Sequence, residues 1–189
     1  MGLDQYIYRV KKLELSERIY TTEELGKMNL HKIAVEDFES NKELYEQLKP
    51  YAIKRDVLCK IYDVEKMITD YNLPSNSHIW GCSGNKIMIG GHDANNQQIN
   101  QTISYDKIER KYTKTEIIPH YIFSTEEVWY WRKHYDLQDW VYENIDNVDN
   151  TAYCILGADL INELNETFEE DIPVEEPTEE SALFYWEWY

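Results

Sequence analysis

The chain has 189 residues, enough to bury a hydrophobic core, and its 36 Asp and Glu outnumber its 19 Lys and Arg, so its formal net charge is -17. Such an excess of carboxylates disfavours direct binding to the phosphates of DNA or RNA. The chain shows no secretory signal and no long apolar run, and its three cysteines are far apart without a CxxC pair, which predicts a cytoplasmic protein that does not enter a membrane.

The negative charge is concentrated at one end of the sequence. Residues 1–120 carry 17 basic and 18 acidic side chains, whereas residues 121–189 carry 2 and 18, a net charge of -16. Two interpretations are open. The acidic third is a solvated face and tail, or its carboxylates imitate the phosphates of a nucleic acid.

Residues 1–15 alternate between two kinds of side chain, which predicts a first strand. One face of this strand carries Leu3, Gln5, Ile7 and Arg9, and the other carries Tyr6, Tyr8 and Val10.

Short helices and a second strand are expected next. Thr22 is placed to cap a short helix, and residues 36–49 predict a longer helix that ends before Pro50. Residues 51–62 are typical of a strand, and Asp63 is placed to cap the helix that follows.

The middle of the chain predicts a hairpin, with Gly84 and Asn85 at its turn. Residues 93–101 are polar and predict an exposed loop. Residues 102–123 are β-prone but are interrupted by a basic patch, which consists of Lys107, Arg110, Lys111 and Lys114. We expect this patch to pair with the acidic third of the same chain or of a second copy. A homodimer is therefore one expected state.

The strongest helix signal begins at Ser124, where hydroxyl and acidic side chains precede an apolar periodic run. It predicts one aromatic-rich helix over about residues 124–145, with a bend near His134, whose buried stripe contains Val128, Trp131, Tyr135 and Trp140. Residues 146–150 favour a turn. Residues 151–156 predict a short strand, and a second amphipathic helix follows Gly157.

These elements together predict an α+β fold with a mainly antiparallel sheet, several short helices and the longer aromatic helix. We expect a single domain over residues 1–170, followed by an acidic tail, 171–189, that ends in aromatic residues. The last six residues, FYWEWY, are too apolar for exposure to water, so they either dock on the sheet or anchor a partner.

The two ends of the chain resemble a family of small bacteriophage proteins that open with MGLD and an aromatic residue and contain a YWRK segment. The matching features are Met1 to Tyr6, Tyr130-Trp131-Arg132-Lys133, Trp140-Val141, Leu160 to Leu164 and the final Phe184 to Tyr189. Residues 20–115 are not matched. The resemblance implies a phage origin and assigns no site.

Three side chains of the types that bind metal ions lie close together in the sequence, His78, Cys82 and His92, spaced H-x3-C-x9-H. It lacks a partner doublet, so the alternative is a hairpin with a buried Cys and two surface imidazoles. Cys82 with His92 or His120 is a further candidate nucleophile pair, without an orienting acid. The glycines have neither Walker nor dinucleotide spacing, and we expect no cofactor.

The preferred hypothesis is a phage protein of the host cytoplasm, not an enzyme, that inhibits a host defence protein with a basic, nucleic-acid-binding surface, in the manner of an anti-CRISPR protein. The residues expected to contact that partner are Asp159, Glu163, Glu166, Glu169, Glu170, Trp186 and Trp188. One alternative is a small metal-dependent or cysteine hydrolase or nuclease. The other is a module that sequesters a nucleotide signal by stacking on Trp and Tyr.

Overall fold

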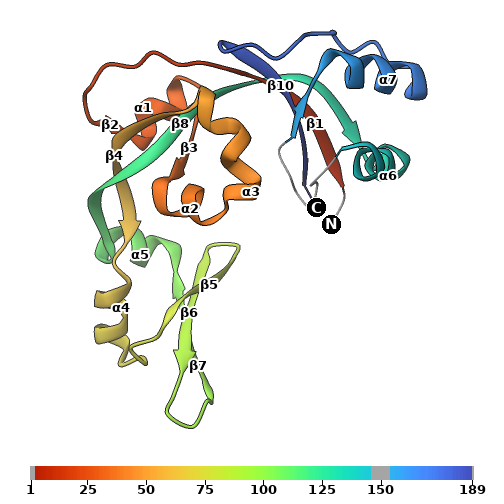
Figure 1. Ribbon diagram of the computed structural model, residues 1–189. Helices are drawn as coiled ribbons and strands as arrows, with labels where there is room; N and C mark the ends of the chain where they lie inside the picture. Colours follow the sequence, from red (N-terminus) through yellow and green to blue (C-terminus); the bar gives the residue numbers. More distant parts are fainter. Residues whose placement is uncertain (1–2, 146–153, 189) are drawn as a thin grey trace. The chain divides into compact units, whose positions relative to one another are not determined.

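The computed structural model describes residues 3–145 and 154–188, with Glu43, Leu44 and Trp188 described by their backbone alone. Figure 1 shows the elements, whose order along the chain is β1 (Asp4–Lys11), β2 (Tyr20–Thr21), α1 (Thr22–Lys27), β3 (Leu30–Ala34), α2 (Val35–Ser40), α3 (Lys42–Tyr45), the 3-10 helix η1 (Glu46–Tyr51), β4 (Ile53–Tyr62), α4 (Val64–Tyr71), β5 (His78–Ser83), β6 (Lys86–His92), β7 (Gln98–Ser104), α5 (Tyr105–Lys111), β8 (Thr113–Arg132), α6 (Tyr135–Asn144), β9 (Cys154–Leu156), α7 (Ala158–Phe168) and β10 (Ser181–Trp188). No helix in the described ranges is long and apolar enough to cross a lipid bilayer.

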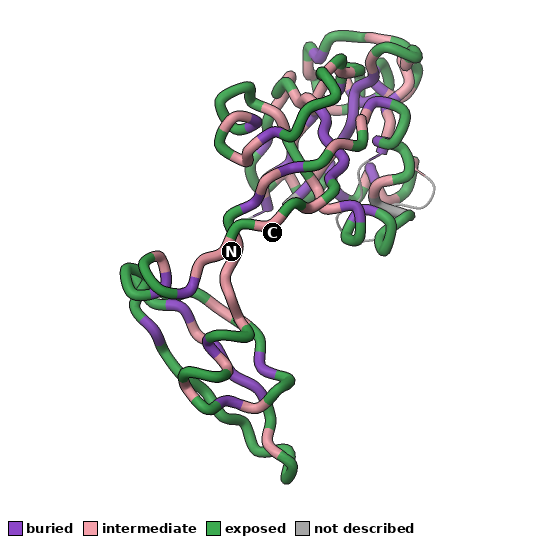
Figure 2. The backbone as a smooth tube through the Cα atoms, turned by 90° about the vertical axis from the view of Figure 1, so that its left-hand side faces the viewer, coloured by how far each residue is buried: buried purple, intermediate pink, exposed green. Residues whose placement is uncertain are grey.

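The chain divides into two compact units, and each has its own buried residues (Figure 2). The first unit comprises Met1–Val57 and Ile118–Tyr189, and the second comprises Leu58–Ile117. One sheet has the strand order β2-β4-β8-β1-β10-β9, with β3 also paired to β8, and the other has the order β5-β6-β7. Pairing is antiparallel between β1 and both its neighbours, between β9 and β10, between β3 and β8, and throughout the smaller sheet. The predicted α+β class with a mainly antiparallel sheet is confirmed.

Strand β1 lies between β8 and β10 and organises the first unit. Its residues alternate as the sequence predicts, with Gln5 and Ile7 fully buried on one face and Tyr6 and Tyr8 half-buried on the other. Helices α6 and α7 lie on one side of β1 and β10, and α2 and α3 lie on the other (Figure 1). Both faces of the sheet are therefore used for packing.

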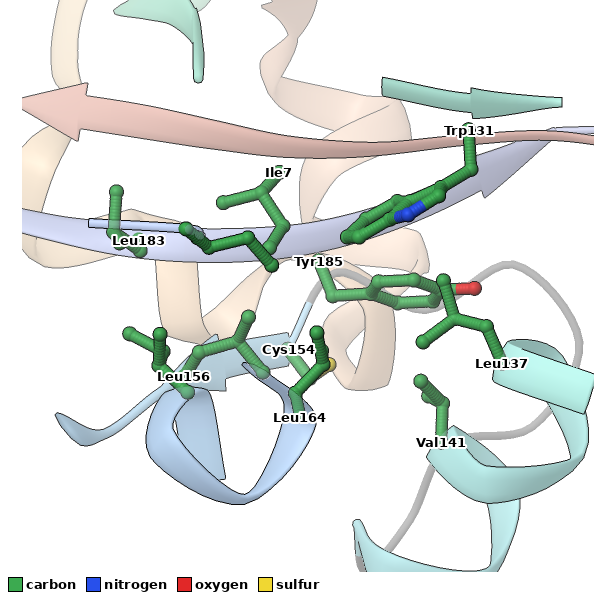
Figure 3. Packing of buried hydrophobic residues seen from close by; sticks show 11 residues of the cluster. Ile7, Trp131, Leu137, Val141, Cys154, Leu156, Leu164, Leu183 and Tyr185 are labelled. Carbon is green, nitrogen blue, oxygen red and sulfur yellow. The ribbon is translucent and has the colours of Figure 1, made fainter. Parts of the chain in front are cut away.

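The face under α6 and α7 holds the largest buried cluster (Figure 3). The ring of Tyr185 lies between the ring of Trp131 and the side chains of Leu137 and Val141 from α6. Leu164 from α7 and Leu156 from β9 enclose the same cluster from below. Burial of these side chains contributes roughly 1.5–3 kcal/mol each, which fixes the helices on the sheet.

A carboxylate is buried beside this cluster and accepts hydrogen bonds from three side chains. Glu187 is fully buried, and its two oxygens accept hydrogen bonds from Gln138 (3.0 Å), from Tyr185 (2.9 Å) and from the hydroxyl of Tyr142. Gln5 donates to the Tyr185 oxygen at 2.9 Å, and burial together with the charge of Glu187 raises the pKa of Tyr185. This network joins β1, β10 and α6. Its donors are needed because a buried carboxylate without hydrogen bonds would be strongly destabilising.

The opposite face is covered over part of its length. Val10 and Phe184 pack against Phe38 from α2 and against Leu48 and Tyr51 from η1. The cover ends before Tyr8 and Tyr6, which contact other aromatic rings of the sheet instead.

The predicted helix over residues 124–145 is wrong in its first half. Residues up to Arg132 continue β8, and α6 begins only at Tyr135. Val, Trp and Tyr are strong strand formers, and β1 pairs with this segment from Ser124 to Arg132, with one register shift that leaves out Val128. Tertiary pairing therefore overrides the local cap signal. The bend expected near His134 is present. Lys133 adopts a left-handed conformation (φ 59°), and His134 Nδ1 caps α6 by accepting from Leu137 N at 3.1 Å.

Two further segments differ from the prediction. The helix expected over residues 36–49 is divided into α2, α3 and η1, with an interruption at Asn41 and Pro50 inside η1. The polar segment of residues 93–101 is a loop only at first, because β7 begins at Gln98.

The end of the chain forms β10, which lies between β1 and β9 in the sheet. Of the two alternatives for FYWEWY, the structure has the docked one for residues 184–188, and Tyr189 lies outside the described residues. No boundary of a compact unit falls at residue 170, since the expected tail supplies this inner strand.

The second unit contains the predicted hairpin of β5 and β6, extended by β7. Asp63 caps α4 by accepting from Lys66 N at 3.1 Å, as the sequence predicts. Ile87, Ile89 and Ile103 of the sheet pack with Met67 of α4 and Ile108 of α5 to form a separate core.

Candidate protein-interaction surface

Helix α7 presents the predicted acidic stripe. Ile161 and Leu164 are fully buried against the sheet, which leaves Asp159, Glu163 and Glu166 exposed on the outer side at helical spacing. The amphipathic pattern that the sequence shows therefore fixes which way the carboxylates point.

These outward carboxylates are not neutralised locally. Within the part of the chain that the structure describes, none of the ion pairs closer than 4.0 Å involves Asp159, Glu163, Glu166 or Glu169. By contrast, Glu126 and Glu175 share Arg9, which lowers the pKa of both carboxyls through hydrogen bonds to its guanidinium.

The remaining two residues of the predicted set lie at the end of α7. Glu169 ends α7 in a left-handed conformation (φ 56°). Glu170 accepts a hydrogen bond of 2.6 Å from the indole nitrogen of Trp131, so it fastens the end of α7 to β8. Glu170 is half-buried, unlike the exposed side chains of α7.

The charge is unevenly divided between the units. The first unit contains 12 Lys and Arg against 29 Asp and Glu, a net charge of -17, and the second contains 7 against 7, a net charge of zero. The whole net charge of the protein thus belongs to the unit that carries α7.

The two predicted tryptophans do not join the acidic stripe. Trp186 lies on the face of the sheet opposite to α7, where its ring stacks on Tyr6 at 5.5 Å between centroids. Trp188 pairs through its backbone with Asp4, and its side chain lies outside the described residues.

Around Trp186 the strands form a surface that we call the aromatic face, made of Tyr6, Tyr8, Tyr130 and Trp186. Tyr6 is directly opposite Trp186 in one ladder and Tyr130 in the other, so three rings form a row across β10, β1 and β8. Ring centroids are 5.0 Å apart for Tyr6 and Tyr130 and 5.2 Å apart for Tyr6 and Tyr8. Sequence reasoning missed Tyr130 because it assigned this residue to a helix; the alternation of residues 128–132 was the available signal.

The phenols of the aromatic face stay protonated at neutral pH. Burial raises the pKa of Tyr6 and brings that of Tyr8 to about 12, and Glu127 adds to both shifts. Tyr130 donates a hydrogen bond of 2.7 Å to Asp4, which raises the pKa of its phenol. The surface is therefore neutral at its rings, and its border carries the acidic Asp4 and Glu127 together with the basic Arg132.

The metal-ligand candidates are not brought together. His78, Cys82 and His92 are all exposed, and the described residues contain no group of three or more His, Cys, Asp or Glu that could hold a metal ion. His78 and Cys82 are four residues apart on one strand, which separates them by roughly 13 Å, too far to share an ion. His120 is buried in the first unit and Cys82 belongs to the second.

The basic patch finds partners within the second unit. Lys111 pairs with Asp70 at 2.6 Å and Lys114 with Glu116 at 2.7 Å, whereas Lys107 lies over the ring of Tyr71. Lys107, Lys111 and Lys114 of the basic patch therefore have partners within the second unit.

Comparison with protein-family models, with curated proteins and with solved structures finds no match to this chain.

Proposed function

We propose that this protein binds and inhibits a basic, nucleic-acid-binding protein of a bacterial host, in the cytoplasm, by presenting carboxylates where that protein normally meets phosphates. A CRISPR effector is one such target. The phage origin that the resemblance implies fits this role.

One observation carries the proposal. The net charge of -17 belongs to one compact unit, and the outer carboxylates of α7 take part in none of its described ion pairs. A uniformly acidic surface would serve solubility alone, whereas charge collected on one unit creates a directed field that attracts a basic partner.

Affinity capture tests the proposal. The tagged protein is incubated with nuclease-treated lysates of candidate bacterial hosts, and bound proteins are identified by mass spectrometry at about 0.1 M and about 1 M salt, where the screening length falls from about 10 Å to about 3 Å. We expect a protein with a nucleic-acid-binding groove, retained only at low salt. Recovery of metabolic enzymes without such a groove would contradict the proposal.

A matched pair of variants separates α7 from general acidity. Glu163→Lys with Glu166→Lys reverses two charges of the stripe, and Glu14→Lys with Glu17→Lys makes the same change at exposed positions between β1 and β2. We expect loss of the partner with the first variant and retention with the second. Equal loss of partner binding in both variants would show that the carboxylates of α7 contribute no more than other acidic residues of the surface.

A further inference from the structure

The aromatic face continues the side of the sheet that α2 and η1 cover, and none of its four residues belongs to the buried clusters that the described helices form with the strands. Tyr130 at its border remains 44% exposed, although the neighbouring rings are packed against one another. Four contacting rings on three strands give a rigid surface, since the ladders of β1 set their spacing.

Carboxylates accompany these rings. Asp4 accepts a hydrogen bond from the hydroxyl of Tyr130, and the negative charges of Asp4 and Glu127 contribute to the raised pKa of Tyr6. Arg132 lies opposite Asp4 in the ladder, where its charge opposes the rise in the pKa of Tyr130, and Lys133 follows it in the chain. Two carboxylates beside electron-rich ring faces form an environment that attracts a positive group.

We propose that the aromatic face binds a Lys or Arg side chain presented by a partner protein. An arginine suits it best, because a guanidinium stacks on aromatic rings while donating hydrogen bonds to carboxylates. This inference deepens the proposed function and rests on it for the basic character of the partner.

Other occupants fit the charges less well. A nucleotide would stack on the rings but bring its phosphates towards Asp4 and Glu127, and a second copy would bring a further net charge of -17 towards the same unit. A cationic side chain of a protein is attracted by both the rings and the carboxylates.

Two substitutions at one position isolate the ring. Tyr130→Ile removes the π system and keeps an apolar strand former, whereas Tyr130→Phe keeps the ring and loses the same hydrogen bond to Asp4. Circular dichroism and thermal unfolding establish that both variants fold.

The probe is a blocked peptide of alternating Gly and Arg, compared with the same peptide containing neutral citrulline, by calorimetry at about 0.5 M salt to suppress long-range attraction. We expect Tyr130→Ile to weaken binding about 3–5-fold, as loss of an exposed cation–π contact predicts, with less than about a twofold change for Tyr130→Phe. Aromatic NMR signals of Tyr6 and Tyr130 should shift on titration with the arginine peptide alone.

Equal binding of the citrulline peptide, equal affinity of the wild type and Tyr130→Ile, or tighter binding of single-stranded DNA than of the arginine peptide would overturn the inference. If a host partner is captured and Tyr130→Ile does not weaken it, the aromatic face is not the contact while the proposed function stands. If the peptide binds as expected but no basic host protein is captured, the proposed function fails and the cation-binding surface stands.

Discussion

Tyr185 donates a 2.9 Å hydrogen bond to Glu187, two residues further along the same strand and on the same face, with both side chains fully buried. Strand residues two apart share a face, so the hydroxyl of Tyr185 can donate to the carboxylate of Glu187 within the same strand. The inner strand β10 thus holds a buried carboxyl group near its C-terminal end.

Glu187→Gln should destabilise the protein by about 2–3 kcal/mol. The amide nitrogen of the new side chain would face one of the donors that now serve Glu187, Gln138, Tyr142 or Tyr185, and leave it unsatisfied. Urea unfolding measures the change, with Glu163→Gln on the exposed side of α7 as a control expected within about 0.5 kcal/mol of wild type. Equal stability of the two variants would show that the network contributes little.

Arg9→Gln should lower the stability at neutral pH by removing a contribution that the wild-type protein loses in acid. The guanidinium holds the pKa of Glu175 below its ordinary value of 4.5, so the contribution is present above that value and is lost as the pH falls through the lowered pKa. Because the pair is partly open to solvent, we expect a loss of only about 1 kcal/mol at pH 7.

Thermal unfolding between pH 7 and pH 2 measures this linkage. The curves of wild type and Arg9→Gln should converge at the acid end, where Glu175 is protonated in both. A difference that stays constant with pH would mean that Arg9 acts through packing alone.

Replacement of glycine by alanine should have opposite effects on stability at Gly90 and at Gly26. A methyl group at Gly90 would lie 2.4 Å from the backbone oxygen of Ile99 in the paired strand, so Gly90→Ala should destabilise by about 1–3 kcal/mol. At Gly26, in α1, nothing lies within 4 Å, and Gly26→Ala should stabilise by about 0.5–1 kcal/mol. Chemical unfolding of the two variants checks both signs, and a neutral Gly90→Ala would mean that β6 and β7 are more loosely paired than the register shows.

Alkylation of the native protein at pH 8 should modify Cys82 alone. Cys59 and Cys154 are buried, and burial raises the pKa of Cys154 to about 12, so its reactive thiolate is scarce at this pH. Peptide mass spectrometry should find one labelled thiol in the folded protein and three after unfolding in guanidinium. Rapid native labelling of Cys154 would contradict the closed packing of β9.

The parts of the fold that could be predicted are those whose signals are local. The alternation of β1, the turn at Gly84, the cap at Asp63 and the amphipathic face of α7 each depend on residues a few positions apart. The structure has all of them where the sequence indicates.

The remaining features depend on pairings between distant residues. Tyr6 meets Tyr130 and Arg9 meets Glu175 only because β1 is inserted between β8 and β10, and no local pattern specifies that insertion. Residues 124–132 carry a helix cap signal and strand-forming side chains at once, and the ladder with β1 decides between them. The same segment supplies Tyr130, so the error in secondary structure concealed the aromatic face as well.

Competition with nucleic acid tests the central claim most directly. The captured host partner is bound to a fluorescent duplex or guide complex that it recognises, and the protein is titrated in while fluorescence anisotropy reports release. Imitation of phosphates predicts full displacement, at least about tenfold weaker for Glu163→Lys with Glu166→Lys than for Glu14→Lys with Glu17→Lys, and steeply dependent on salt. A stable ternary complex in which the partner holds both the nucleic acid and this protein would contradict it.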